Sequence, residues 1–417
     1  MTEQIVTVEA EEETSRETKK EYVSSVPMWK RRSKERFSVE FIGYTPEISD
    51  LTQKPKNKNT LWFILGIAFS AVAIVILIYN DVQSGNMTPV WDAYQVIGQN
   101  IIWLFLCILA YVAALMMDGL AFSSLFKIAS GKFQLGLGVR IHIIGQYYNN
   151  ITPLAVGGQP FQIHTLTKEG MSVGKASSVV ISRYSLRQLV FNFLMLGFLI
   201  FAPVASVFSQ LDPVAANLIK VGAYIGLVFM MAIPTFLIFV ALSKKAGERI
   251  VHGILIVLYK LKIVRKFDKT KRKIMAQVEN YRVSLRFFFS KKLTFITQII
   301  LNLVEFFALI SIPYFVYRMF GGEGEQWVTV IALFIYATLA VSFIPTPGGA
   351  GAADFSGSFI FGVLLTASGF AFWAVISWRL FTFYIFILVG IIYFINRGIN
   401  KFFLKRQYRK QSENQLE

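Results

Sequence analysis

Residues 327–373 read WVTVIALFIYATLAVSFIPTPGGAGAADFSGSFIFGVLLTASGFAFW, two apolar runs separated by a short segment rich in proline and glycine. The runs, 327–344 and 355–373, have the length and composition of membrane helices. The intervening segment 345–354 joins Thr-Pro to a glycine pair, which ends one helix, leaves backbone groups free and permits a new helix to begin. The stretch therefore predicts a broken helix inside a membrane protein.

A second segment of the same kind, 149–160, reads NNITPLAVGGQP. Irregular backbone is tolerated at membrane depth only where it is buried in protein or lines a wet cavity. We therefore expect the two broken helices to line a site. As re-entrant hairpins they would enter from opposite faces, as inverted repeats do. The alternatives are plain Pro-Gly kinks, with 327–344 and 355–373 as two full spans.

The composition is that of an integral membrane protein. Of 417 residues, 54% are hydrophobic, 15% aromatic and only 16% charged, and the mean hydropathy is +0.52. The sequence predicts an all-α, polytopic bundle of transmembrane helices with about eight hydrophobic segments. These are 60–79, 101–117 and approximately 175–203, 218–242, 293–317, 327–344, 355–373 and 376–396.

The net charge of +17 suits cytoplasmic anchors between spans better than contacts to DNA. Residues 1–59 form an acidic and then basic tail, expected to be disordered, and 397–417 form a basic tail. Between the transmembrane halves 60–242 and 293–396, residues 243–292 carry fifteen Lys and Arg against three acids. We expect a multi-pass protein of the cell membrane with both termini cytoplasmic. Within the basic loop, 250–267 is either an interfacial amphipathic helix or a solvated linker.

Several kinds of chemistry have no support in the sequence. The single cysteine, Cys107, cannot form an intramolecular disulfide or a cysteine metal cluster. His142, His164 and His252 lack a spacing that would converge on a metal ion. No nucleotide-binding or hydrolase motif occurs. We therefore expect no metal, no cofactor and no catalytic residue.

Charged residues inside apolar runs are costly and usually face a partner or a cavity. Arg183 follows the first broken helix and Arg379 follows the second, and a guanidinium suits a lipid phosphate. The alternative is that each arginine snorkels to the interface or pairs with Glu305 or Asp354 for structure alone. Asp118, which the sequence places near a helix end, and Arg187 are expected to be interfacial.

The candidate substrate-binding residues lie in or after the two broken helices, with the glycine amides as neutral phosphate donors. For the asparagine pair, capping of a freed helix end is the alternative. The set is Asn149, Asn150, Thr152, Pro153, Gly157, Gly158, Gln159, Arg183, Glu305, Thr346, Pro347, Gly348, Gly349, Asp354 and Arg379.

The two motifs, in this order and with an arginine after the first, resemble those of the lysylphosphatidylglycerol synthase transmembrane-region family, often called flippase-like. The resemblance runs from about residue 60 to 400. It implies the membrane half of enzymes that lysylate phosphatidylglycerol and move the product outward, without their soluble synthase domain. The family commonly has Glu where this sequence has Gln159 and Asp354, which weakens the transfer of its substrate to this chain.

The function expected from this resemblance is translocation of a phospholipid, such as aminoacylated phosphatidylglycerol or a lipid-linked headgroup, between leaflets. The alternative is a membrane component of phosphatidylglycerol lysyltransferase, which takes lysine from lysyl-tRNA and confers resistance to cationic peptides and antibiotics. That alternative would give the basic loop a soluble synthase partner. A homo-oligomer is a further possibility left open.

Overall fold

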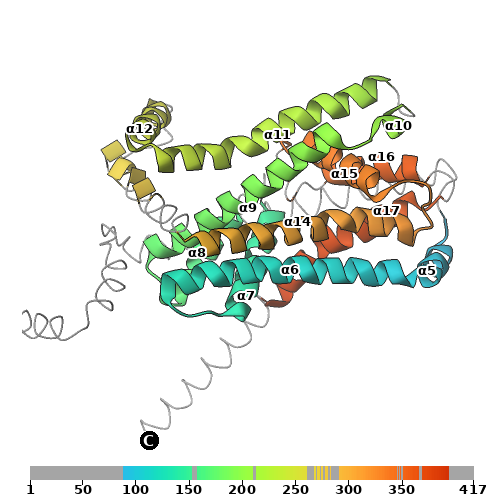
Figure 1. The fold of residues 1–417 in the computed structure, drawn as a ribbon, viewed down its shortest axis with the longest axis horizontal. Coiled ribbons are helices and arrows are strands. Elements are labelled where there is room, and N and C mark those ends of the chain that lie inside the picture. The colour runs from blue at the N-terminus through green and yellow to red at the C-terminus, as the bar shows by residue number, and fades with distance from the viewer. Residues whose placement is uncertain are drawn as a thin grey trace, which may run out of the picture. The chain divides into compact units, whose positions relative to one another are not determined.

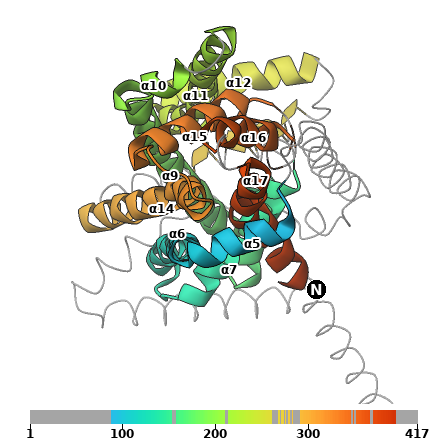
Figure 2. The same ribbon diagram turned by 90° about the vertical axis from the view of Figure 1, so that its right-hand side faces the viewer.

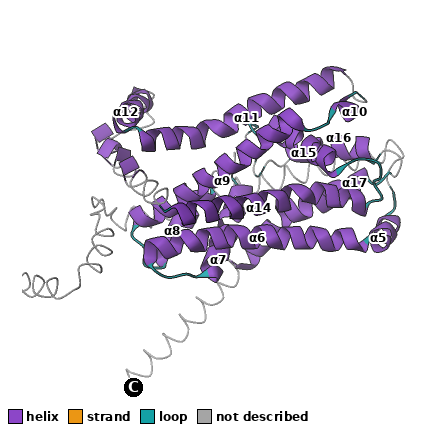
Figure 3. Cartoon of the chain, in the orientation of Figure 1, coloured by secondary structure: helices purple, strands orange, loops and turns teal. Residues whose placement is uncertain are grey.

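The computed structural model describes residues 88–152, 157–209, 213–260, 291–344, 346, 348, 351–365 and 369–393, with scattered positions between 267 and 282. These residues belong to one compact unit, 47–417. The expected first span 60–79 and both tails lie outside the described residues. Everything described is helix, turn or loop, without a strand (Figure 3), so the all-α expectation is confirmed.

Twelve α-helices and one π-helix make up the described chain. They are α5 (Val90–Gln99), α6 (Ile101–Ser130), α7 (Leu135–Asn150), α8 (Gly158–Lys168), α9 (Val173–Phe201), α10 (Ala205–Phe208), α11 (Pro213–Leu242), α12 (Lys244–Lys260), α14 (Lys292–Met319), α15 (Trp327–Val341), α16 (Ala352–Leu364), α17 (Ala371–Arg379) and η1 (Leu380–Tyr384).

Within the described residues, five helical segments are long and apolar enough to cross a membrane, which confirms an integral membrane protein with several spans. They are Ile101–Ser130, Val173–Phe201, Ala216–Phe236, Lys292–Met319 and Ala371–Tyr393. Helices α6 and α14 run side by side along the bundle (Figure 1). Figure 2, turned by 90°, shows α9, α11 and α15–α17 grouped beside them.

Helix α6 corrects one expectation from the sequence. We expected its span to end at Met117, with Lys127 in a loop, but the helix continues for 30 residues to Ser130. Asp118 therefore lies inside the helix and is 2% exposed, so its expected interfacial position is wrong. The helix ends where Gly131 takes a left-handed φ of 79° and donates its amide to the Lys127 carbonyl, a C-terminal cap that glycine favours.

Two pairs of short helices flank the two proline–glycine segments. α7 ends at Asn150 and α8 begins at Gly158, while α15 ends at Val341 and α16 begins at Ala352. At 1.5 Å per residue these helices measure about 16 to 24 Å, shorter than a hydrocarbon core of about 30 Å. In Figure 1, α7 and α8 lie towards the left-hand end of the bundle and α15 and α16 towards the right-hand end.

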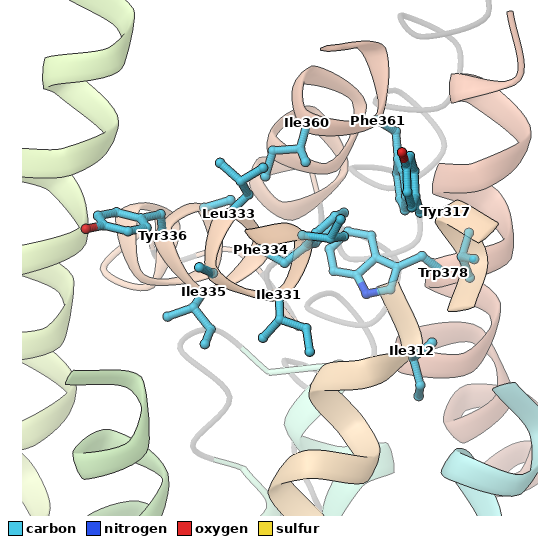
Figure 4. Packing of buried hydrophobic residues seen from close by; sticks show 14 of the residues in the cluster. Ile312, Tyr317, Ile331, Leu333, Phe334, Ile335, Tyr336, Ile360, Phe361 and Trp378 are labelled. Carbon is cyan, nitrogen blue, oxygen red and sulfur yellow. The ribbon is translucent and has the colours of Figure 1, made fainter. Parts of the chain in front are cut away.

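Helix α15 forms the centre of the core. Its residues from Thr329 to Leu333 and on to Ala337 are all buried, the pattern of a helix surrounded by protein on every side. Phe334 packs against Phe361 at 4.9 Å and Trp378 at 5.1 Å between ring centroids, as Figure 4 shows. On another side of α15, the Tyr336 hydroxyl donates to the Leu199 carbonyl at 2.9 Å.

Glycines allow α11 to approach α15 closely. A Cβ at Gly222 would lie 3.2 Å from the Ala340 Cβ, and one at Gly226 would overlap the Leu339 carbonyl. Small residues at such contacts are typical of helix pairs in membranes, where close backbone approach supplies the packing energy. The two glycines thus fix how α11 lies against the core helix.

Two helices lie across the ends of the bundle. Each is seen end-on in Figure 1 and lengthwise in Figure 2, α5 at the right-hand end of Figure 1 and α12 at the left-hand end. α12 buries Val251 and Leu255 in a small apolar cluster and exposes Ile254 and Val257. The helix begins at Lys244, six residues before the predicted start at residue 250. The basic residues that precede the predicted segment are therefore helical as well.

Candidate functional site

The first proline–glycine segment is held by its own polar side chains. Asn149 Oδ1 accepts the Gly158 amide at 2.8 Å, and Thr152 Oγ1 accepts the Gly157 amide at 2.9 Å. Thr152 also donates to the Tyr148 carbonyl at 2.7 Å, which ties the segment to the end of α7. These bonds satisfy amides at the start of α8 that would otherwise be unpaired.

The second proline–glycine segment meets the first. A Cβ on Gly348 would lie 2.9 Å from the Asn150 carbonyl oxygen, so only glycine fits against this backbone. Gly348 also has a φ of 57°, in the left-handed region that favours glycine. Asn150 in turn donates through Nδ2 to the Phe383 carbonyl at 3.3 Å, within the π-helix η1. Residues about 200 positions apart therefore form one contact region.

Arg379 lies at this contact region, at the end of α17. Its Nε is 2.5 Å from Asp354 Oδ1, and its Nη2 donates to Asp354 Oδ2 at 3.5 Å. Asp354 also accepts the Gly351 amide at 2.8 Å, which caps the start of α16. The guanidinium lies 4.5 Å from the Phe383 ring centroid, over the π-helix that follows. Such π-helical turns inside α-helices occur frequently at functional sites.

A second charged cluster joins four helices. Arg183 of α9 is 1% exposed and binds Asp118 of α6, Asn302 of α14 and, at 2.7 Å, Glu305 of α14. Glu305 accepts a further bond of 2.7 Å from Arg187 Nε, and Asp118 contacts the Nδ1 atom of His142 on α7. Two carboxylates thus face two guanidinium groups. This balance allows charged side chains to remain buried at membrane depth.

A cavity of about 400 Å³ separates these groups from the second proline–glycine segment. Its walls are mostly apolar and come from α6, α7, α9, α11, α14, α15, α16, α17 and η1. The titratable side chains on its walls are Tyr111, His142, Glu305 and Arg379, and Thr346 and Gly348 of the second segment line it as well. The Thr346 hydroxyl is buried without a hydrogen-bond partner among the described residues. Apolar walls with a few polar groups are typical of small-molecule and lipid sites.

The structure distributes the predicted site residues unevenly. Glu305, Thr346, Gly348 and Arg379 line the cavity, and Asp354 pairs with Arg379 behind the wall. Gln159 is half-buried in the first turn of α8 and is not part of the cavity wall. Pro153, Pro347 and Gly349 lie outside the described residues.

Two expected roles do not match the geometry. The amides of Gly157 and Gly158 already donate to Thr152 and Asn149, so they are not free phosphate donors, and Asn149 acts as the cap that was the alternative. Arg183 is enclosed by Asp118 and Glu305 and does not reach the cavity wall. Its role here is to hold Glu305, the side chain that does line the cavity.

Glu305 was a candidate from the sequence, but Asn302 and His142 of the charged cluster and the neighbouring Gln298 were not predicted as part of a site. Gln298, Asn302 and Glu305 are all buried and recur at i, i+4 and i+7, which places them on one face of α14. That polar stripe inside an apolar run was a signal available in the sequence. His142 and Gln146 show the same spacing of four on α7 and both line the cavity. Among the described residues, no three His, Cys, Asp or Glu side chains converge as metal ligands.

Comparison with known families agrees with this architecture. No curated protein matches the chain in sequence. The family model for the lysylphosphatidylglycerol synthase TM region matches residues 63–390, which include both proline–glycine segments, the cavity described above and all but the last three residues of the spans. The chain therefore belongs to the lysylphosphatidylglycerol synthase TM region family.

Proposed function

We propose that this protein moves a phospholipid between the leaflets of the membrane, with the headgroup passing through the central cavity. The observation that carries the proposal is Arg379, a cation on the wall of a 400 Å³ cavity inside a bundle of membrane-spanning helices. Ionisable groups at membrane depth are costly, and they usually mark a substrate pathway. A passing phosphate can replace the Asp354 carboxylate at the same guanidinium fork.

The charges of the cavity suggest which headgroups it accepts. Arg379 of α17 offers a cation to phosphate, and Glu305 of α14, which already accepts bonds from Arg183 and Arg187, offers a carboxylate of the same cavity to an amino group. A zwitterionic or aminoacylated phospholipid carries both complements. The Thr346 hydroxyl, which has no hydrogen-bond partner within the described part of the chain, adds a neutral donor and acceptor beside them. Aminoacyl-phosphatidylglycerol is therefore the substrate that we test first.

The arrangement in the membrane is part of the proposal. We take α7–α8 and α15–α16 as re-entrant pairs that enter from opposite faces and meet at Asn150 and Gly348. Support comes from their short lengths, from their places at the two ends of Figure 1 and from the Gly348 contact. Lys127, Lys132 and the basic loop would lie on the cytoplasmic side with both termini. Glu323 and Glu325 would lie outside.

The test is lipid movement in proteoliposomes that contain acyl-labelled phosphatidylglycerol or its lysyl ester, measured with an impermeant quencher. Arg379→Gln should slow movement roughly 10- to 100-fold, the loss expected for about 1.5 to 3 kcal/mol of charge-assisted bonding. Arg379→Lys should retain part of the rate because it keeps the charge without the planar fork. Arg318→Gln is the matched control, since Arg318 lies at the end of α14 outside the cavity. Equal rates for wild type and both Arg379 variants would contradict the proposal.

The family description favours a second candidate, a membrane component of the lysyltransferase itself, with a soluble synthase partner at the basic loop. Total and outer-leaflet aminoacyl-phospholipid in cells with and without the gene separate the two functions. A constant total with a smaller outer fraction supports translocation. A collapse of the total supports synthesis instead.

A further inference from the structure

A second cavity, of about 310 Å³, lies against a neighbouring face of α15. Its walls come from α10, α11, α15 and α16 and are almost wholly apolar. Helix α16 lines it with Phe355, Phe359 and Val363, which recur every four residues and so share one face. A space of this size without polar partners does not hold ordered water, because water needs hydrogen-bonding groups.

The mouth of this apolar cavity lies on the surface of the bundle. Phe355 is 71% exposed and Leu218 of α11 is 68% exposed, although both line the cavity. Leu218 belongs to a segment that is long and apolar enough to cross the membrane. At membrane depth the molecules that reach such a mouth are lipid chains. With α11 spanning the membrane, the exposed apolar side chains at this place would face lipid acyl chains.

The apolar cavity adjoins the central one. Val341, the last residue of α15, lines both cavities. The start of α16 is shared as well, since Ala353 lines the central cavity and Phe355 the apolar one. Asp354, between these two residues, is the partner of Arg379. The central cavity, which holds a cation on its wall, and the apolar cavity with its lateral mouth thus adjoin at one turn of α16.

From this arrangement we infer that the apolar cavity is a binding site for one acyl chain of a glycerophospholipid. The headgroup of the same lipid lies at Arg379, and the chain passes the end of α15 at Val341. This inference rests on the proposed function in placing the headgroup in the central cavity. It assigns a new role to the surface between α11 and α16, which holds the chain while the headgroup crosses.

The experiment uses the full-length protein in phosphatidylcholine vesicles that contain phosphatidylglycerol with a photoreactive diazirine on one acyl chain. After illumination, mass spectrometry locates the attached lipid. In the wild type, labelling should concentrate on peptides that contain Leu218 and Phe359. Ala337→Phe and Val363→Phe each fill the cavity from a different wall and should reduce that labelling roughly tenfold, the loss that about 1.4 kcal/mol of steric cost produces.

The matched control is Ile225→Phe, on the same helix as Leu218, because Ile225 is 55% exposed and lies outside the cavity wall. Its labelling should equal that of the wild type. Labelling spread evenly over exposed helices, labelling unchanged by both filling variants, or cross-linked dimers in place of lipid adducts would each overturn the inference. Transport is measured on the same samples. Absent transport with selective labelling defeats the proposed function alone, whereas normal transport with unselective labelling defeats the acyl-chain site alone.

Discussion

Replacement of Glu305 by glutamine tests whether the charged side chains of the buried cluster neutralise one another. Glu305 is fully buried, and each of its two carboxylate oxygens accepts one bond of 2.7 Å, from Arg183 and from Arg187. With Asp118 it balances the two guanidinium groups. Glutamine has nearly the same shape, but it removes one negative charge and places an NH₂ donor against an arginine donor.

The expected loss of unfolding free energy follows from the number of charges that the substitution leaves unpaired. Removal of one partner from a buried ion pair leaves an uncompensated charge and costs about 3 to 5 kcal/mol. The Arg187 side chain is 23% exposed, so water reaches it in part, whereas that of Arg183 is 1% exposed. In the double variant Arg187→Gln/Glu305→Gln, one anion (Asp118) and one cation (Arg183) remain, so the buried charges are balanced again. It should recover about 1 to 3 kcal/mol relative to the sum of the single variants.

The assay is unfolding of the purified protein in mixed micelles of increasing SDS fraction, followed by circular dichroism. Glu169→Gln is the matched control, since the Glu169–Arg140 pair is solvent-exposed and should contribute less than about 1 kcal/mol. A Glu305→Gln loss equal to that of Glu169→Gln would refute the reasoning. So would a double variant whose loss equals the sum of the two single losses.

Two glycine substitutions test the close contacts by thermal unfolding. Gly348→Ala places a side chain at a φ of 57° and against the first proline–glycine segment, so it should destabilise by about 1 to 2 kcal/mol or more. Its control, Gly136→Ala in the open first turn of α7, should instead stabilise by about 0.4 to 1 kcal/mol. Gly226→Ala should cost about 1 to 3 kcal/mol by forcing α11 away from α15, whereas Gly197→Ala, with open space around it, should not destabilise. Equal effects within either pair would show that these contacts do not limit stability.

Local chemistry explains what the sequence predicted well. Hydropathy depends on neighbouring residues alone, so the runs 175–203, 218–242 and 293–317 predicted α9, α11 and α14 within a few residues at most ends. Proline and glycine act locally too, and the helices around both motifs end and begin at or near them. The end of α6 was predicted wrongly because it depends on contacts between residues that are distant in the sequence. Asp118 seemed to end a helix because its buried partners are 24 and 65 residues away.

The sequence by itself thus determined the class of the protein, its family and the places where helices break, because these depend on short-range periodicity, composition and backbone restrictions. Only the tertiary structure decided which charges pair. Arg183 meets Glu305 across 122 residues, and Asn150 meets the π-helix across 233. Such pairing depends on the rotation and depth of each packed helix, and the cost of burying an unpaired charge selects it. The same packing left Arg379 on the cavity wall and enclosed Arg183 behind it.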